Sequence, residues 1–573
     1  MAPDKARDKQ PIDLVLCWHM HQPDYRDHRR DEYRFPWVYL HAVKDYADMA
    51  AHLEAAPRAR AVVNFSPVLL QQLEDYSRML EGFLKGGKAL RDPLLEALAA
   101  TVFPSDTNHR TALIKACLRA NRKHMIEPYP AYRRLADIAD LVIRDEGSAY
   151  VSHQYLADLL TWYHLVWLSE SLLRSDPLAG ELMAQGGGFS LHQRRQLLDL
   201  IARQIASLGP RYRRLAEDGR VELSVSPLGH PILPLLLDFG AAREALPDLP
   251  LPEHRRYPGG EARARWHIEE GLRVFQRFFG TRPEGCWPPE GAVSAAALKL
   301  LADAGFRWAA TGEAVLRNSA AASGIEDDAP DPLYSAWSPA DAGIRLYARN
   351  DGLSDLIGFS YADWDAEHAV EDLIEKIIAI GDAYTGKDGP VVSIIMDGEN
   401  AWEYFPHNGW YFLNTLYSRL SEHPRIRLAT YSSHLQAPAP KLKRIVAGSW
   451  VHGTLTTWIG SEDKNGAWDL LSDAKQLYDE VVARADVDEA LNEALATQLA
   501  ACEGSDWFWW FGDYNPAAAV SDFEYLYRLH LSNLYTLLQR EPPPSLSRPL
   551  SQGRGQPGRG GVMRAGAPDA TAS

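Results

Sequence analysis

Residues 391–409 read VVSIIMDGENAWEYFPHNG, and this stretch indicates the fold more clearly than any other part of the chain. Residues 391–396 form a short, nearly uninterrupted apolar run, typical of a strand covered on both faces in a parallel sheet. Asp397 and Gly398 then mark the carboxyl end of that strand, where the loops of α/β folds carry chemistry. Taken alone, an Asp-Gly pair after a core strand is more often a structural turn.

Seven more short apolar runs read as strands, and helix-forming stretches such as residues 261–279 and 366–383 lie between them. These runs are residues 12–18, 61–65, 221–225, the short run before Trp287, 307–311, 344–349 and 426–430. Alternating strands and helices predict a parallel βα barrel. Residues 67–220 are rich in Leu, Ala, Arg and Glu at helical spacing, which predicts a helical insertion over the barrel mouth.

The expected domain organisation follows from these patterns. We expect an α/β protein with a flexible N-terminus over residues 1–10 and a catalytic barrel over 11–435, with the helical insertion at about 67–220. A C-terminal α-helical domain is expected over 436–540, and a disordered tail rich in Pro and Gly over 541–573.

Composition argues against several classes of partner. The formal charge of -16 disfavours nucleic acid and acidic membrane surfaces, since binding to either needs basic patches. The four cysteines are widely spaced, which indicates neither a disulfide framework nor a structural zinc site. The chain starts with charged residues and has no run of about 18 apolar residues, so we expect a cytoplasmic protein without a membrane span. Nothing in the sequence indicates an oligomeric state.

A second acid stands in a comparable setting. WPPEGAVS, residues 287–294, places Glu290 beside Trp287, and the prolines at 288 and 289 hold it on a stiff corner. Two acids at strand ends fit glycoside hydrolysis, which needs one carboxylate at the anomeric carbon and one carboxylic acid at the leaving oxygen. The chain also carries 17 Trp and 25 Tyr, whose faces stack on the C–H faces of sugars.

Five motifs, in this order and at these intervals, resemble the signature regions of glycoside hydrolase family 57. They read HMHQPDY (19–25), GHPILPL (229–235), WPPEGAVS (287–294), MDGENAWEYFPHNG (396–409) and WIGSEDKNGAWDLL (458–471). The resemblance spans about residues 10–540 and implies a parallel (β/α)7 incomplete TIM-like barrel. One of the eight strands is therefore expected to be peripheral, with residues 61–65 a better candidate than the run before Trp287.

The resemblance implies roles for individual residues. Glu290 matches the catalytic nucleophile and Asp397 the general acid/base of a retaining enzyme that acts on α-glucans, without a metal or other cofactor. The positions expected to bind substrate are His19, His21, Gln22, His230, Trp287, Arg349, Asp355, Trp402, Trp458 and Trp468. For Arg349 and Asp355, a structural salt bridge is an equal alternative. A retaining pair should lie roughly 5 to 5.5 Å apart, with Glu290 ionised and Asp397 protonated near neutral pH.

Three activities remain open. We favour an α-amylase or amylopullulanase type hydrolase of α-1,4-glucans, because EGAVS, WIGSEDKNGAW and SDWFWWFGD look more like that side of the family. A branching enzyme or 4-α-glucanotransferase shares the chemistry up to the glycosyl-enzyme. Outside the family, His19, His21 and Asp24 could hold a metal as in polysaccharide deacetylases or α-mannosidases. The aromatics of residues 504–513 fit either a glucan subsite or a packing seam between the C-terminal domain and the barrel.

Overall fold

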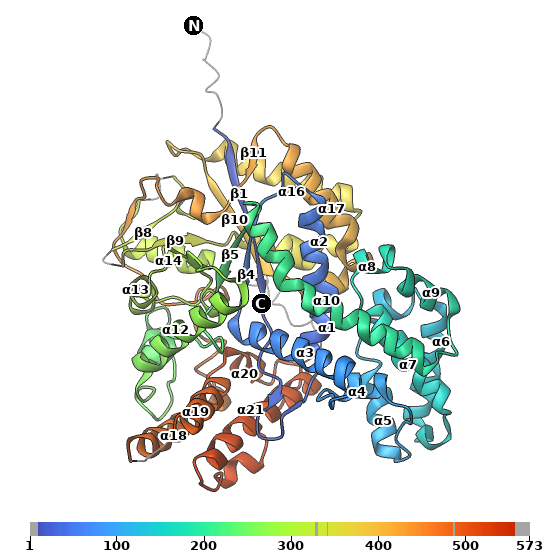
Figure 1. Cartoon of the computed structure of the whole chain (residues 1–573). Coiled ribbons are helices and arrows are strands. Elements are labelled where there is room, and N and C mark those ends of the chain that lie inside the picture. The colour runs from blue at the N-terminus through green and yellow to red at the C-terminus, as the bar shows by residue number, and fades with distance from the viewer. Residues whose placement is uncertain (1–9, 327–329, 341, 485–487, 556–573) are drawn as a thin grey trace.

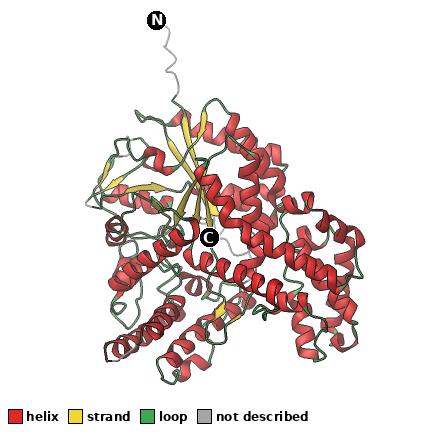
Figure 2. Ribbon diagram, in the orientation of Figure 1, coloured by secondary structure: helices red, strands yellow, loops and turns green. Residues whose placement is uncertain are grey.

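The computed structural model of this protein describes residues 10–326, 330–340, 342–484 and 488–555 (Figure 1). Parallel strands stand at its centre and helices surround them, as the colouring by secondary structure shows (Figure 2). Residues 1–9 and 556–573 lie outside the described ranges, so the flexible N-terminus and the end of the predicted tail remain predictions.

Seven strands form the barrel in the order β10, β1, β4, β5, β6, β7, β9, and neighbours along this path pair in parallel. Their bounds are β1 (Ile12–Met20), β4 (Ala61–Phe65), β5 (Val221–Val225), β6 (Gly285–Cys286), β7 (Trp308–Thr311), β9 (Arg345–Ala348) and β10 (Val391–Asp397). Between β9 and β10, the backbone N–H of Asn350 donates to the carbonyl of Ser393 at 2.8 Å. This nearly closed arrangement confirms the predicted incomplete (β/α)7 barrel.

The peripheral strand is β11 (Ile426–Leu428), and the expectation that favoured residues 61–65 is wrong. β11 pairs only with the start of β1, whereas β4 pairs with the end of β1 and with all of β5. The cause is the length of β1, whose nine residues are all buried and give room for two neighbours along the same edge.

Helices connect and cover the strands. Those near the barrel are α1 (Trp37–His41), α2 (Ala47–Ala55), α3 (Pro67–Gly86), α11 (Leu233–Leu237), α12 (Gly260–Phe279), α13 (Ala295–Asp303), α14 (Glu313–Ala322), α15 (Asp351–Asp355), α16 (Ala366–Ala383) and α17 (Trp410–Glu422). A short hairpin of β2 (Arg26–Asp27) and β3 (Glu32–Tyr33) follows β1, and β8 (Ser338–Pro339) pairs with β12 (Lys441–Leu442). In the described ranges no helix has the length and apolar character needed to span a bilayer.

The insertion after β4 is helical, as the sequence predicts. After α3 it contains α4 (Pro93–Ala99), α5 (Thr107–Ala116), α6 (Pro130–Arg144), α7 (His153–Val166), α8 (Glu170–Ser175), α9 (Pro177–Gln185) and α10 (Leu191–Glu217). Helices α4 to α9 form a lobe beside the barrel (Figure 1). Trp162 and Tyr163 on α7 are buried, in agreement with a core role for this aromatic helix.

The C-terminal region is helical as well, with α18 (Glu462–Arg484), α19 (Glu489–Cys502), α20 (Ser505–Trp510) and α21 (Ala517–Leu537). A buried ion pair fixes it to the barrel helix α12. Glu503 accepts hydrogen bonds from Arg263 Nη2 at 2.6 Å and Tyr257 Oη at 2.6 Å, and lies 2.7 Å from His267 Nε2. Burial opposes ionisation of Glu503, but the Arg263 guanidinium and His267 hold its pKa well below the usual range.

Replacing Glu503 by alanine is expected to destabilise the protein by about 3 to 5 kcal/mol, because Arg263 would be left buried and uncompensated. Unfolding in denaturant measures this loss as a change in the free energy of unfolding. Glu480→Ala, which breaks the exposed pair with Arg484 on α18, should cost less than about 1 kcal/mol. A folded pKa below the ordinary 4.5 means that Glu503 stabilises the fold above that pH, and that this contribution is lost as the pH falls further. The difference between wild type and Glu503→Ala should therefore shrink in acid; a difference independent of pH would contradict this account.

Residues 541–555 correct a prediction. The expectation of disorder from Glu541 onward is wrong for this part, where Leu546 is buried and Leu550 packs on the core. The backbone N–H of Leu550 donates to Glu524 on α21 at 2.8 Å, and Ser551 Oγ accepts from Gly512 N–H at 2.9 Å. The polar, proline-rich composition of this segment indicated disorder, but Leu546 and Leu550 hold the segment against α21.

Candidate active site

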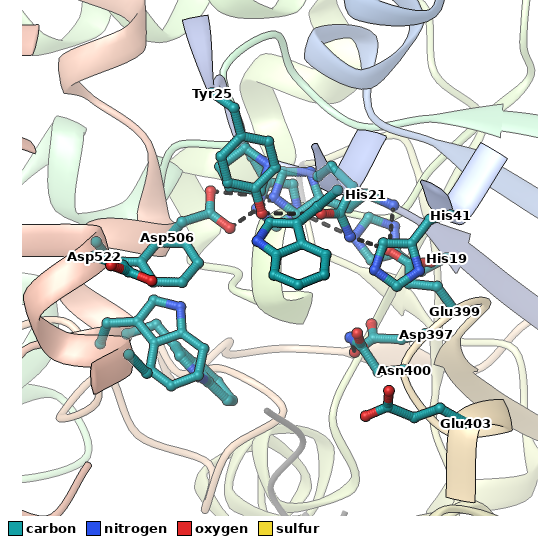
Figure 3. Close-up of a pocket in the computed structure, with 18 of the residues that line it drawn as sticks. His19, His21, Tyr25, His41, Asp397, Glu399, Asn400, Glu403, Asp506 and Asp522 are labelled. Carbon is teal, nitrogen blue, oxygen red and sulfur yellow. Dashed lines mark hydrogen bonds and ion pairs between the residues drawn. The ribbon is translucent and has the colours of Figure 1, made fainter. Parts of the chain in front are cut away.

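A cavity of about 560 Å³ lies where the carboxyl ends of the barrel strands meet the insertion and the C-terminal helices. Figure 3 shows Asp506 and Asp522 entering it from the C-terminal region and Asp397 with Asn400 from the opposite side. Its lining includes seven predicted site residues, which are His19, His21, Gln22, His230, Trp287, Glu290 and Asp397. The fold thus brings together side chains from the ends of four strands, β1, β5, β6 and β10, and from the loops that follow them.

Glu290 sits on a strained corner. Its φ is 59° and its ψ is 23°, in the left-handed region that residues other than glycine rarely adopt. Pro288 and Pro289 lead into this corner, as the sequence indicates. The carboxylate accepts hydrogen bonds from Trp450 Nε1 at 3.1 Å and from Ser505 Oγ at 3.2 Å, one on each oxygen. The backbone strain and the two donors together fix the direction of this carboxylate.

Asp397 is the last residue of β10, as predicted, and Asn400 Nδ2 donates to its carboxylate at 2.9 Å. The next residue, Gly398, donates its N–H to the carbonyl of His19 at 2.7 Å. A Cβ at Gly398 would meet the thioether of Met20, which would have to move, so glycine leaves room for this turn beside β1. This turn joins the ends of β10 and β1 and holds Asp397 beside the histidines of β1.

Three histidines form a stack in the cavity. The ring centroids of His21 and His230 are 3.8 Å apart and those of His19 and His230 are 5.1 Å apart, with nearly parallel planes. His230 also has a positive φ of 55°. Burial, reinforced by the neighbouring His21, lowers the pKa of His19 to about 3 and holds that of His230 well below the usual range. Both rings are therefore neutral at physiological pH.

Each histidine is oriented by hydrogen bonds. His19 Nδ1 lies 2.7 Å from Asn64 Oδ1, and His19 Nε2 lies 3.2 Å from His230 Nε2. His21 lies between two partners: its Nδ1 is 2.8 Å from Ser66 Oγ and its Nε2 is 2.9 Å from Asp506. His230 Nδ1 lies 2.9 Å from Ser505 Oγ. A chain of contacts thus runs from Asn64 to Glu290 through His19, His230 and Ser505.

The metal-binding hypothesis for His19, His21 and Asp24 does not fit the structure. Asp24 instead binds Arg26 and His28, each at 2.8 Å. The described residues do bring one ligand atom each from His19, His21 and His230 within 4.8 Å of one another. Nearly parallel, stacked imidazoles point their in-plane lone pairs side by side and not toward one centre, and their ring nitrogens already have partners.

Five predicted site residues are absent from the cavity lining and lie in or beneath its walls. Arg349 donates to the carbonyl of Ile395 at 2.9 Å, and its guanidinium lies 5.3 Å from the ring centre of Trp450. Its ion pair with Asp355, at 2.6 Å, is the structural alternative that the sequence left open. The buried indoles donate to backbone carbonyls, namely Trp402 to Gly398 and Trp468 to Trp458, both at 2.9 Å.

Sequence reasoning missed Trp450, Ser505 and Asp506, which come from the region after the barrel. The only signal was the aromatic segment 504–513. Trp509 and Trp510 line the cavity, while Trp507, Phe508 and Phe511 are buried and pack on other aromatic residues of the C-terminal region. Asp506 and Ser505 precede these aromatics on the same short helix, α20.

The acids of the cavity are strongly perturbed. Burial, together with the charges of Asp506 and Asp397, raises the pKa of Glu290 to about 8. Burial also raises the pKa of Asp397, in the direction that a proton donor needs. This direction for Glu290 is opposite to the one that an acid ionised near neutral pH needs; burial is its largest cause, and the charge of Asp506, which the sequence did not place there, adds to it.

Replacing Asp506 by asparagine is expected to lower the pKa of Glu290 by about one unit, because a nearby negative charge is removed while an acceptor for His21 remains. Subtracting the infrared spectrum of Glu290→Gln from that of the protein with Glu290 leaves the C=O band of the protonated Glu290 carboxyl. In the wild type this band should disappear near pH 8, and in Asp506→Asn at lower pH. Glu403→Gln removes another acid of the same lining and should leave the midpoint in place. Equal midpoints in wild type and Asp506→Asn would contradict this electrostatic role.

A family model described as glycosyl hydrolase family 57 matches residues 15–446. No curated protein matches the chain.

Among solved structures, a branching enzyme from Thermococcus kodakaraensis is 15% identical with a TM-score of 0.54, covering 92% of this chain and 90% of its own. A branching enzyme from Pyrococcus horikoshii is 16% identical with a TM-score of 0.55, covering 92% and 89%. The α-amylase AmyC from Thermotoga maritima is 13% identical with a TM-score of 0.55, covering 92% and 93%. At such identities the structural likeness establishes the fold alone.

Proposed function

Since the chain belongs to glycoside hydrolase family 57, we propose that it is a retaining hydrolase of α-1,4-linked glucans, of the α-amylase or amylopullulanase type. The observation that carries this proposal is the meeting of Glu290 and Asp397 in one cavity, with Trp287, Trp509 and Trp510 in its wall. One acid on a rigid corner and one at a strand end are the two groups that retaining glycoside hydrolysis requires.

The proposed mechanism assigns one role to each acid. The pair reacts in the state that carries one proton, on Asp397: ionised Glu290 attacks the anomeric carbon while Asp397 gives that proton to the departing glycosidic oxygen, and a glycosyl ester on Glu290 results. Asp397 then takes a proton from water, which attacks the same carbon and releases Glu290. Trp450 and Ser505 donate to the two oxygens of Glu290, so they stabilise the carboxylate when it leaves the sugar.

Substrate contacts are proposed for the residues that line the cavity. His19, His21, Gln22 and His230 offer ring and amide groups for sugar hydroxyls, and Trp287 forms part of the apolar floor. Arg349, Asp355, Trp402, Trp458 and Trp468 act from behind this surface, by holding the backbone and the side chains that face the substrate.

The alternative activity is glucan transfer, as in a branching enzyme or 4-α-glucanotransferase. Hydrolysis and transfer share the glycosyl-enzyme and differ in whether water or a sugar hydroxyl resolves it. The preference for hydrolysis rests on the motifs after the nucleophile and in the C-terminal region, EGAVS, WIGSEDKNGAW and SDWFWWFGD.

Incubation with amylose tests the proposal. Reducing ends and iodine absorbance are followed together, with a Glu290→Ala protein prepared in parallel as the control for contaminating amylase. We expect reducing ends to rise steeply while the iodine colour fades. A shifted iodine spectrum without new reducing ends would show transfer instead, and no change in either readout would contradict action on α-1,4-glucans.

A further inference from the structure

A second cavity of about 1030 Å³ lies next to the active site. The strand β3 and the residues after it, helices α4, α5 and α21, and the tail segment after Leu546 provide its walls. Phe35 and Tyr525 are aromatic residues in its lining, and Glu524 and Arg528 are charged ones. The tail that sequence reasoning assigned no role contributes Gln552 and Gly553.

The two cavities adjoin. Asp522 lines both, and its ion pair with Arg119, at 3.2 Å, stands at the boundary. Arg119 lines the active-site cavity, while its guanidinium lies 5.7 Å from the ring centre of Phe35 in the second cavity. The Arg119–Asp522 ion pair is therefore one of the contacts between the two spaces.

An aromatic track connects them. Trp510 stacks on Phe523 with ring centroids 4.9 Å apart, and Phe523 lies 6.4 Å from Tyr25. These three residues line the active-site cavity, and Tyr25 in turn lies 5.9 Å from Phe35 in the second cavity. Trp510 and Phe523 pack face to face and the two further pairs are tilted or edge-on, so these residues form a continuous apolar wall against which the apolar faces of sugar rings can lie.

Tyr525 continues this track as an exposed platform. Its side chain is 39% exposed, and its hydroxyl accepts a hydrogen bond from Arg34 Nη2 at 3.0 Å. The Arg34 guanidinium also lies 5.7 Å from the centre of the Tyr525 ring. The ring is thus held in one orientation before any ligand arrives, which reduces the entropy lost on binding.

We propose that the second cavity binds a further segment of the same α-glucan chain whose scissile bond lies between Glu290 and Asp397. This inference rests on the proposed function and adds to it a preference for long chains. Paired charges around the platform, such as Glu524 with Arg528, offer hydrogen bonds to sugar hydroxyls without presenting a net charge that would favour an ionic ligand.

The test measures binding to amylose in a background that does not turn it over. In Asp397→Asn protein, mobility in native gels containing amylose yields a dissociation constant for each variant. Tyr525→Ala is expected to weaken amylose binding by about tenfold, as loss of one stacking platform implies, and Tyr525→Trp to restore it. Calorimetry with maltotriose, a chain of three rings that we expect to bind in the active-site cavity, should give the same affinity in all three proteins.

Tyr411→Ala is the matched control. Tyr411 is also exposed, at 51%, and is also held by an arginine, with Arg174 Nη2 3.3 Å from its hydroxyl and the guanidinium 5.4 Å from its ring centre. It lines neither of the two cavities, so its removal should leave amylose binding unchanged.

The outcomes separate the two proposals. If Tyr525→Ala binds amylose as tightly as Tyr411→Ala while the wild type still degrades amylose, the second cavity is no glucan site and the proposed function stands. If Tyr525→Ala weakens maltotriose binding as much as amylose binding, the substitution affects glucan binding in general and the inference is overturned. If the parent protein binds no amylose and the wild type does not act on it, both proposals fall.

Discussion

Replacing Glu290 by alanine is expected to lower kcat on amylose by a factor on the order of 10⁴ or more, because the group that attacks the anomeric carbon is removed. The fold should survive, since Glu290 contributes no apolar packing and its two donors, Trp450 and Ser505, lie beside a cavity that water can enter. Circular dichroism and thermal unfolding check this. Activity within tenfold of the wild type would contradict the assignment.

The role of Glu290 can be read from the product of chemical rescue. In the Glu290→Ala protein, azide has room to occupy the place of the missing carboxylate and attack an activated substrate such as an α-maltosyl fluoride. One displacement inverts the anomeric centre, so the product expected is the β-glycosyl azide. An α-glycosyl azide would instead indicate that Glu290 is the acid/base and that the two roles are exchanged.

Replacing Asp397 by alanine is expected to reduce kcat on amylose by about 10² to 10⁴, because general acid catalysis of the departing oxygen is lost. The loss should be far smaller for α-maltosyl fluoride, whose leaving group needs no proton. Glu403→Gln is the matched control, because Glu403 belongs to the same segment and lines the same cavity. An equal loss on both substrates would argue against a proton donor.

Azide also tests Asp397. In Asp397→Ala, Glu290 still forms the glycosyl-enzyme and azide resolves it in place of activated water. Two displacements retain the anomeric configuration, so the α-glycosyl azide is expected. The opposite anomers from the two variants would therefore assign both carboxyls independently of any rate comparison.

Much of the barrel could be predicted from local patterns. The bounds of β4 and β5 agree with the predicted residues 61–65 and 221–225, and α16 with 366–383. These elements are short apolar runs or amphipathic stretches whose burial on folding depends little on which neighbour covers them. The status of β11 could not be foreseen, since residues 426–430 have the same apolar pattern as the barrel strands and only pairing separates them.

In the active site, too, some residues could be predicted from the local sequence and others could not. Glu290 and Asp397 stand out locally, one directly after a tryptophan and two prolines and the other at the end of an apolar run. Ser505 and Asp506 carry no such mark, and the hydrogen bond between Ser505 and Glu290 joins residues 215 positions apart. The periodicity of the residues within either segment does not indicate a contact between residues so far apart in the chain.

The sequence alone therefore predicted the barrel, its two candidate acids and the elements that present them, because these depend on patterns within about twenty residues. The tertiary structure decided which donors orient Glu290, which charges surround it and which surfaces adjoin the site. A pKa responds to every charge nearby in space, and for Glu290 the strongest charge is Asp506, contributed by α20 of the C-terminal region. Because β7, β9, β10 and helices α13 to α19 lie between these two residues in the chain, their proximity is a property of the fold.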